Sequence, residues 1–177
     1  KRQVFGFPAS FTKSISASVL GIPVIAIVAI IVALILAFLT IKTKLGRNIY
    51  ALGGNKESAW YSGINVKLHT LIVFIISGLC AGIAGIVLLG RVGSAEPAAA
   101  TGFETYAIAA AIIGGTSFFG GKGKIHGVVV GGLIIGVINY GMNILSLSST
   151  LQQVVMGALI IGSVALDRFV GSKNTSK

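Results

Sequence analysis

The sequence predicts an all-α, polytopic transmembrane helix bundle. Of its 177 residues, 54% are hydrophobic and 10% are charged, whereas an ordinary soluble domain has about 45–50% apolar and about 25% charged residues. Four stretches contain no Asp, Glu, Lys or Arg, and they are residues 14–41, 68–90, 105–121 and 125–166. A membrane-spanning helix needs about 20 mostly apolar residues. A bilayer is therefore the natural solvent for this chain.

Five crossings are the expected number. The last apolar stretch is long enough for two passes, and Ser, Thr and Gln side chains interrupt it at residues 146–153, which predicts a turn at the water interface. The stretch 105–121 is the weakest because it is short and rich in glycine. We favour a full crossing there, and a broken or re-entrant segment buried among other helices is the alternative.

The start of the chain differs in composition from the spans that follow it. Residues 1–20 are polar and Ser-rich and include several aromatic residues, which predicts an interfacial loop or the remnant of an upstream element. Pro23 then stands near the start of the first span, where its missing N–H costs least. Later spans carry GxxxG patterns at residues 78–82 and 132–136, and small residues let helix backbones approach closely in a bilayer.

The net charge of +10 fits the positive-inside rule better than it fits a nucleic-acid surface, because the basic residues stand between apolar spans. With residues 42–69 in the cytoplasm, most of the basic side chains lie inside: Lys42, Lys44, Arg47, Lys56, Lys67, Lys122, Lys124, Arg168, Lys173 and Lys177. Those outside are Lys1, Arg2, Lys13 and Arg91. We therefore expect the amino end outside and the carboxyl end in the cytoplasm.

The hydrophilic loop 42–69 contains a compact helix signal. Gly53 and Gly54 predict a turn, and Asn55 is a good N-cap residue. Residues 56–62 can then form about two helical turns, and Gly63 is placed to end them in a left-handed conformation. We expect a short helix on the cytoplasmic face.

Three side chains on this short helix draw attention. Glu57 lies near the positive end of the helix dipole. Trp60 and Tyr61 are aromatic residues on a surface helix, which is typical of anchors for a partner's groove. The alternative is an aromatic belt at the membrane interface.

The amino-acid sequence of this loop is characteristic of one family. GRNIYALGGNKESA at residues 46–59, followed by SGINV at 62–66, resembles the cytoplasmic loop of permeases of the ribose, xylose, galactose and arabinose class of binding-protein-dependent ABC importers. The likeness continues through GGTS at 114–117 and GGKG at 120–123, and it covers nearly all of residues 21–167. Chains of that family are longer, so residues 1–177 resemble their carboxyl-terminal half as one transmembrane permease domain.

The resemblance implies a set of partners. Two permease copies, as a homodimer or a paralogue heterodimer, would form a central pathway in the bilayer, driven by cytoplasmic ABC ATPases and supplied by an extracytoplasmic sugar-binding protein. ATP and magnesium would be bound by the ATPase, so no cofactor is expected in this chain. The implied location is the cell membrane of a prokaryote, and no nucleic-acid partner is expected.

Loop 42–69 would then be the coupling loop, and residues 56–62 the helix that docks on the ATPase. The residues expected to couple to the ATPase are Gly46, Arg47, Gly53, Gly54, Asn55, Glu57, Ala59, Trp60 and Gly63. The family more often has Ala at the place of Ser58, and a basic and then an apolar residue at the place of Trp60 and Tyr61. These departures concern the docking contacts.

Other polar residues suggest further sites. Asn139 and Asn143 lie one turn apart on one helix face, and an amide buried in hydrocarbon needs a partner. With Thr116 they are candidates for the translocation pathway, and interhelical hydrogen bonding is an equal alternative for the two amides. Arg91, Glu96 and Glu104 share the expected outer face, where they either contact a binding protein or are ordinary solvated charges.

Several chemistries are disfavoured. The glycines and Lys of residues 115–122 miss the P-loop spacing by one residue, so a partner must hydrolyse the nucleotide and the chain is not expected to be an enzyme. His69 and His126 stand far apart without cysteine or paired carboxylates, and we assign no metal. Cys80 is read as a packing residue.

The function we expect is that of the membrane-spanning permease subunit of an ATP-driven importer for ribose or a similar monosaccharide. An ion-coupled secondary sugar transporter is the alternative. Such a carrier usually places a carboxylate within a span, whereas the only acids here are Glu57, Glu96, Glu104 and Asp167, all outside the middle of the spans.

Overall fold

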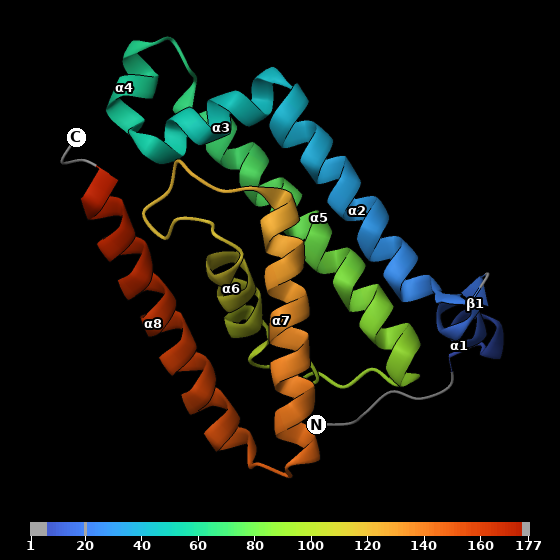
Figure 1. Cartoon of the computed structure of the whole chain (residues 1–177). Coiled ribbons are helices and arrows are strands. Elements are labelled where there is room, and N and C mark those ends of the chain that lie inside the picture. The colour runs from blue at the N-terminus through green and yellow to red at the C-terminus, as the bar shows by residue number, and fades with distance from the viewer. Residues whose placement is uncertain (1–6, 20, 175–177) are drawn as a thin grey trace. The chain divides into compact units, whose positions relative to one another are not determined.

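The computed structural model describes residues 7–19 and 21–174, and most of them form helices (Figure 1). The predicted all-α fold is thereby confirmed. The elements in chain order are α1 (Ala9–Ser16), β1 (Ser18–Val19), β2 (Ile22–Pro23), α2 (Val24–Lys42), α3 (Lys44–Gly54), α4 (Lys56–Tyr61), α5 (Val66–Val92), α6 (Phe103–Ile113), α7 (Ile125–Ile144) and α8 (Ser149–Asn174).

The contacts within the chain divide it into two compact units. The first comprises Lys1–Ile49 and Gly63–Thr101, and the second comprises Tyr50–Ser62 and Gly102–Lys177. The hydrophilic loop 42–69 therefore contributes to both. Its middle part, with the end of α3 and the whole of α4, belongs with α6, α7 and α8.

Among the described residues, three helices, α2, α5 and α7, are long and apolar enough to cross a bilayer. They correspond to the first, second and fourth predicted crossings. α2 begins directly after Pro23, as the position of that residue predicts, and it is apolar on every face without a buried side chain. The polytopic membrane character is confirmed by these helices together with the shorter apolar helices α6 and the first part of α8.

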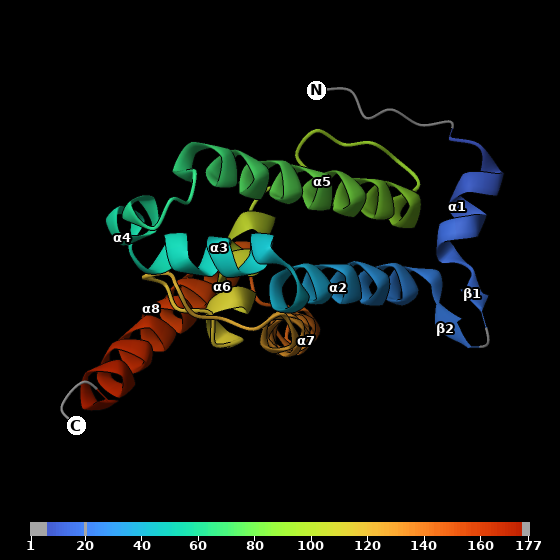
Figure 2. The ribbon, with the colours of Figure 1, turned by 90° about the horizontal axis from the view of Figure 1, so that it is seen from above.

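The lead-in to α2 is more ordered than the interfacial loop we expected. Helix α1 begins after Pro8, and Phe11 and Ile15 recur on it four residues apart, which is a helical spacing. α1 packs on α5, where the Ile15 side chain lies against Gly90. A two-stranded antiparallel ladder, β1 with β2, then leads into α2 (Figure 2).

The predicted third crossing is not one continuous helix. α6 has 11 residues and is therefore about 16 Å long, roughly half the thickness of a hydrocarbon core. It ends at Gly114, and Gly115 follows with a φ of +83°, a conformation that glycine adopts without strain. The chain continues as a loop to Lys124. The segment is broken, as in our alternative, and whether it crosses the bilayer stays a prediction.

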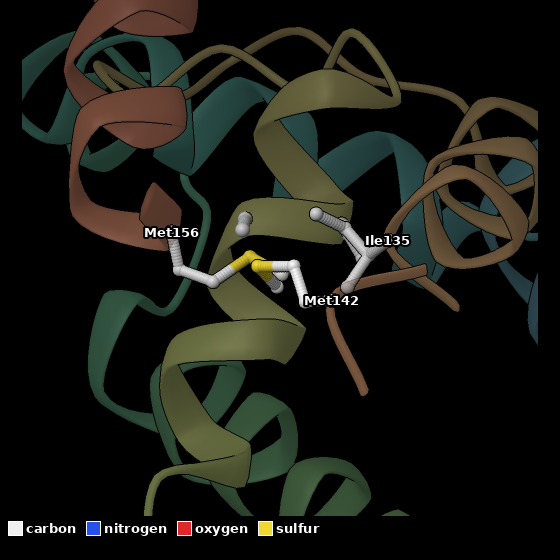
Figure 3. Close-up of a cluster of buried hydrophobic side chains, with 5 residues drawn as sticks. Ile135, Met142 and Met156 are labelled. Carbon is white, nitrogen blue, oxygen red and sulfur yellow. The ribbon is translucent and has the colours of Figure 1, made fainter. Parts of the chain in front are cut away.

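α6 is the most enclosed helix of the second unit. It packs against both α7 and α8, and its residues Ala109, Ala110 and Ile112 are buried. Figure 3 shows the side chains of Met142, Met156 and Ile135 gathered against it, and Met156 is completely buried. Unbranched methionine side chains adapt to irregular gaps, and here they fill the space between three helices.

The glycines at which α6 and α7 approach each other closely are not those of the GxxxG patterns named in the sequence analysis. A methyl group on Gly131 would overlap the carbonyl oxygen of Ala110, and one on Gly127 would overlap that of Gly114. Gly132 and Gly136, which form the pattern that the sequence analysis named, have no atom within 4 Å of an added methyl group. Residues 127–131 are themselves a GxxxG pattern, and the choice between two adjacent patterns depends on which helix face meets α6.

Candidate functional site

Helix α4 forms as the sequence predicts. The Asn55 side-chain oxygen accepts a hydrogen bond from the Ser58 N–H at 3.0 Å, and Glu57 lies in the first turn. The backbone N–H of Ser62 closes the last turn on the Ser58 carbonyl oxygen, and Gly63 follows with a φ of +79°. The cap and the left-handed glycine are both confirmed.

The side chains of α4 divide between a buried and an exposed face. Ala59 is only 3% exposed, whereas Trp60 is 63% and Tyr61 79% exposed. The two aromatic rings meet edge to face, with 5.0 Å between their centroids. α4 thus presents a preformed aromatic pair, with the exposed Glu57 carboxylate on the same short helix.

The segment before α4 corrects one prediction. Gly53 and Gly54 do not form a turn of their own, because they are the last residues of helix α3, and the Asn55 N–H still bonds to the Ala51 carbonyl oxygen at 3.1 Å. The apolar residues Leu45, Ile49 and Leu52 have helical spacing, and this signal would have revealed α3.

The start of α3 is held by a tight bend after α2. The Gly46 N–H donates to the Thr43 hydroxyl at 3.2 Å, and a methyl group on Gly46 would overlap the backbone of Thr40. Gly46 is therefore required by this bend, while its neighbour Arg47 is exposed. At the other end of the loop, the Asn65 side-chain oxygen caps α5 by accepting a hydrogen bond from the Leu68 N–H at 3.0 Å.

The loop between α6 and α7 lies against the end of α3 within the second unit. The Tyr50 hydroxyl donates a hydrogen bond to the Gly123 carbonyl oxygen at 2.9 Å. Gly53 faces Gly121 so closely that an added methyl group would lie 2.9 Å from the Gly121 nitrogen. Lys122 and Lys124 therefore share one end of this unit with residues 50–54, and the side of the membrane on which this end lies stays a prediction.

The far part of α8 reaches the same end of the unit. The Ser117 hydroxyl donates to the Asp167 carboxylate at 3.0 Å. From Ser149 to Asp167, α8 covers 19 residues, or about 28 Å, which nearly equals the length of α7. The apolar part of α8, Ser149–Ala165, is shorter than the three candidate spans, so the last predicted crossing stays a prediction.

The three candidate pathway residues are not gathered in one place. Thr116 lies at the end of α6, where its side chain would be 3.0–3.3 Å from a methyl group on Gly123. Asn139 and Asn143 lie in the last turns of α7, at the opposite end of that helix. α7 has 20 residues and is about 30 Å long, so Thr116 is remote from the two amides.

The amides of α7 belong to a hydrogen-bonded group. The Asn143 side-chain nitrogen donates to the Asn139 side-chain oxygen at 2.8 Å, and the Gln152 side-chain nitrogen donates to Asn143 at 3.3 Å and to the Leu147 carbonyl at 3.0 Å. Gln152 is 9% exposed. This geometry is that of hydrogen bonding across the α7–α8 turn. Our pathway set left out Gln152, although its polarity inside an apolar stretch was a signal.

The candidate binding-protein residues have local roles in the two units. Arg91 is exposed in the last turn of α5, and the Glu96 carbonyl oxygen accepts the Ala99 N–H in the loop that follows. In the second unit, the Glu104 carboxylate accepts the Gly102 N–H at 3.1 Å, at the start of α6. Their predicted contact with a binding protein stays a prediction.

Metal-binding side chains are scattered. Across residues 7–19 and 21–174, no three His, Cys, Asp or Glu side chains are placed to hold a metal ion together. His69 instead contacts the Asn48 side chain at 3.0 Å. The local chemistry is that of hydrogen-bonded loops and an exposed aromatic helix.

Comparison with known proteins identifies a family. Residues 1–164 match the family described as "Branched-chain amino acid transport system / permease component". The chain is 66% identical to the D-allose transport system permease protein AlsC of Escherichia coli over 94% of its own length and 51% of that protein. It is 46% identical to the ribose import permease protein RbsC of Bacillus subtilis, over 84% and 46% of the two chains.

A third relative, the probable ABC transporter permease protein YphD of Escherichia coli, is 41% identical over 82% of this chain and 44% of its own length. The chain thus spans about half the length of these curated relatives. No solved structure matches it.

Proposed function

The chain belongs to the family of permease components of the branched-chain amino acid transport type, and from this premise we propose that it is part of the permease of an ATP-driven importer for a small sugar. One observation carries the proposal. The 66% identity to a D-allose permease extends over 94% of the chain, whereas the ribose permease reaches 46% over 84%. D-Allose is therefore the first substrate to test, and ribose is the second.

Helix α4 is the proposed coupling helix, on which the ATPase docks. It is capped by Asn55 and buries Ala59, so its backbone is held in place, while Trp60 and Tyr61 are exposed. Exposed aromatic side chains on a rigid element are favourable anchors because they bury a large area at little entropic cost. Glu57 adds an exposed carboxylate on the same helix, and Arg47 is an exposed basic residue earlier in loop 42–69.

The proposed partners follow from this role. A cytoplasmic ABC ATPase binds ATP and magnesium, an extracytoplasmic protein delivers the sugar, and a second permease copy completes the pathway in the bilayer. The carboxyl end is proposed to be cytoplasmic, because Asp167 near the end of α8 contacts Ser117, in the loop that lies against residues 50–54. An ion-coupled carrier is disfavoured by the permease relatives.

Uptake measured in reconstituted vesicles tests the proposal. The full-length permease carrying this sequence is reconstituted with its ATPase and binding protein, and ATP-dependent uptake of labelled D-allose, D-ribose and D-xylose is compared. We expect saturable D-allose uptake that stops when ATP is replaced by a non-hydrolysable analogue. Uptake driven by a proton or sodium gradient without ATP would contradict the proposal.

A further inference from the structure

Beside the Tyr50 hydrogen bond, the end of α3 and the α6–α7 loop touch through backbone atoms. A methyl group on Gly121 would lie 2.8 Å from the Gly54 Cα, and one on Gly53 would lie 2.9 Å from the Gly121 nitrogen. A methyl group on Gly120 would overlap the Gly53 carbonyl oxygen. We call these four residues, Gly53, Gly54, Gly120 and Gly121, the glycine junction. Because glycine has no side chain, the backbones are in direct contact at these positions. A movement of one segment toward the other must therefore displace the other segment.

The loop side of the glycine junction is a closed turn. The Ser117 N–H donates to the Lys122 carbonyl oxygen at 3.0 Å, and the Gly120 N–H donates to the Ser117 carbonyl oxygen at 3.2 Å. Gly120 and Gly121 both have positive φ angles, +91° and +73°, which residues with a side chain adopt only at a cost. Because these bonds close the turn on itself, it should move as a unit.

This turn is attached at both ends to the helices of the bundle. The Thr116 N–H donates to the Ala111 carbonyl oxygen in α6 at 3.0 Å. On the other side, Gly123 accepts the Tyr50 hydroxyl directly before α7 begins. Just beyond, the backbones of Gly114 and Gly127 are in close contact and join α6 to α7. A displacement of the turn therefore reaches both helices.

From these contacts we infer that the glycine junction and the Tyr50 hydrogen bond transmit movement of the coupling helix to α6, the half-length helix enclosed by α7 and α8. The inference rests on the proposed function, since it presumes that an ATPase moves α4. α4 follows Gly54 after a single residue, so the shortest covalent path from the docking helix leads into the junction. Ala109 in α6 has no exposed surface, so a shift of this helix must repack its neighbours.

Two glycines of the same loop allow a matched test. Gly121→Ala places a methyl group against Gly54, whereas Gly115→Ala meets the same left-handed backbone, with a φ of +83°, but has no atom within 4 Å. In the reconstituted importer, sugar transported per ATP hydrolysed is measured together with ATPase binding. We expect Gly121→Ala to bind the ATPase and hydrolyse ATP but to transport about tenfold less sugar per ATP. Gly115→Ala should stay within about twofold of the wild type.

A milder pair keeps the test decisive if Gly121→Ala does not assemble. Tyr50→Phe removes only the hydroxyl that bonds to Gly123, and Tyr140→Phe removes an exposed hydroxyl on α7 as its control. We expect the ratio of transport to hydrolysis to fall about threefold for Tyr50→Phe alone. If the importer transports sugar but the variants give the same ratio of transport to hydrolysis as their controls, the inferred role of the glycine junction is wrong. The proposed function would still stand. A wild-type importer that transports no sugar would overturn the proposed function itself.

Discussion

The Tyr50 hydroxyl donates a hydrogen bond to the carbonyl oxygen of Gly123, 73 residues further along the chain, at 2.9 Å. This bond joins the hydrophilic loop before α4 to the loop that connects α6 with α7. Each of the two loops carries basic residues that the positive-inside rule predicts to be cytoplasmic, and in the second loop these are Lys122 and Lys124. The half-length α6 and the loop that follows it thus end at the same face of the second unit as α4.

The Asn55 cap should be required for coupling. α4 has six residues, and loss of an N-cap side chain costs about 1 kcal/mol, which lowers the population of such a short helix several-fold. We expect Asn55→Ala to reduce ATP-dependent uptake without reducing the amount of permease in the membrane. Asn65→Ala, which removes the equivalent cap of the 27-residue helix α5, is the control. Equal loss of uptake in both variants would argue against a special role of α4.

The approach of α6 to α7 should depend on Gly131 and not on Gly132. Gly131→Ala places a methyl group on the Ala110 carbonyl oxygen, while Gly132→Ala meets open space. Overpacking of this kind costs about 1–3 kcal/mol, so we expect a lower midpoint of thermal unfolding in detergent for Gly131→Ala only. If Gly132→Ala were the more damaging variant, the face of α7 that meets α6 would be wrong.

Of the two adjacent glutamines at the start of α8, only Gln152 should be needed for thermal stability. Gln152→Ala leaves the Leu147 carbonyl oxygen and the Asn143 side-chain oxygen without the Gln152 donor, at a cost of about 1–3 kcal/mol. Gln153→Ala changes an exposed side chain. We expect Gln152→Ala to lower the unfolding midpoint while the sugar concentration for half-maximal uptake stays unchanged. A change in that concentration without a loss of stability would place these amides in the sugar pathway.

The sequence predicted features that depend on neighbouring residues better than those that depend on distant ones. Asn55, Glu57 and Gly63 act within one short helix, so its cap and its end could be read directly. α3 was missed because two glycines were taken as a turn, although the chain holds them helical through the contacts of the glycine junction. The helix faces that meet in the bundle depend on tertiary packing, which is why the 132–136 pattern was chosen over the 127–131 pattern.

The polar candidates show the same limit. Spacing placed Asn139 and Asn143 on one face correctly, and their side chains do bond to each other. Their link to Gln152 needs the turn between α7 and α8, whose geometry includes a positive φ at Ser146. Thr116 was grouped with them on chemistry alone, and the length of α7 separates them.

The central claim is that this chain is a sugar importer's permease driven through α4, and Trp60 offers the most direct measurement. Trp60 is 63% exposed on α4, and Phe74 is 71% exposed on the apolar helix α5 and serves as the control. Truncation of an aromatic anchor typically costs about 2 kcal/mol or more of binding energy. ATP-dependent uptake of labelled D-allose and binding of the ATPase are measured in vesicles for Trp60→Ala, Phe74→Ala and the wild type. We predict that Trp60→Ala alone weakens ATPase binding about 30-fold and reduces uptake in proportion. If Trp60→Ala took up D-allose and bound the ATPase as well as the wild type does, the claim would be contradicted.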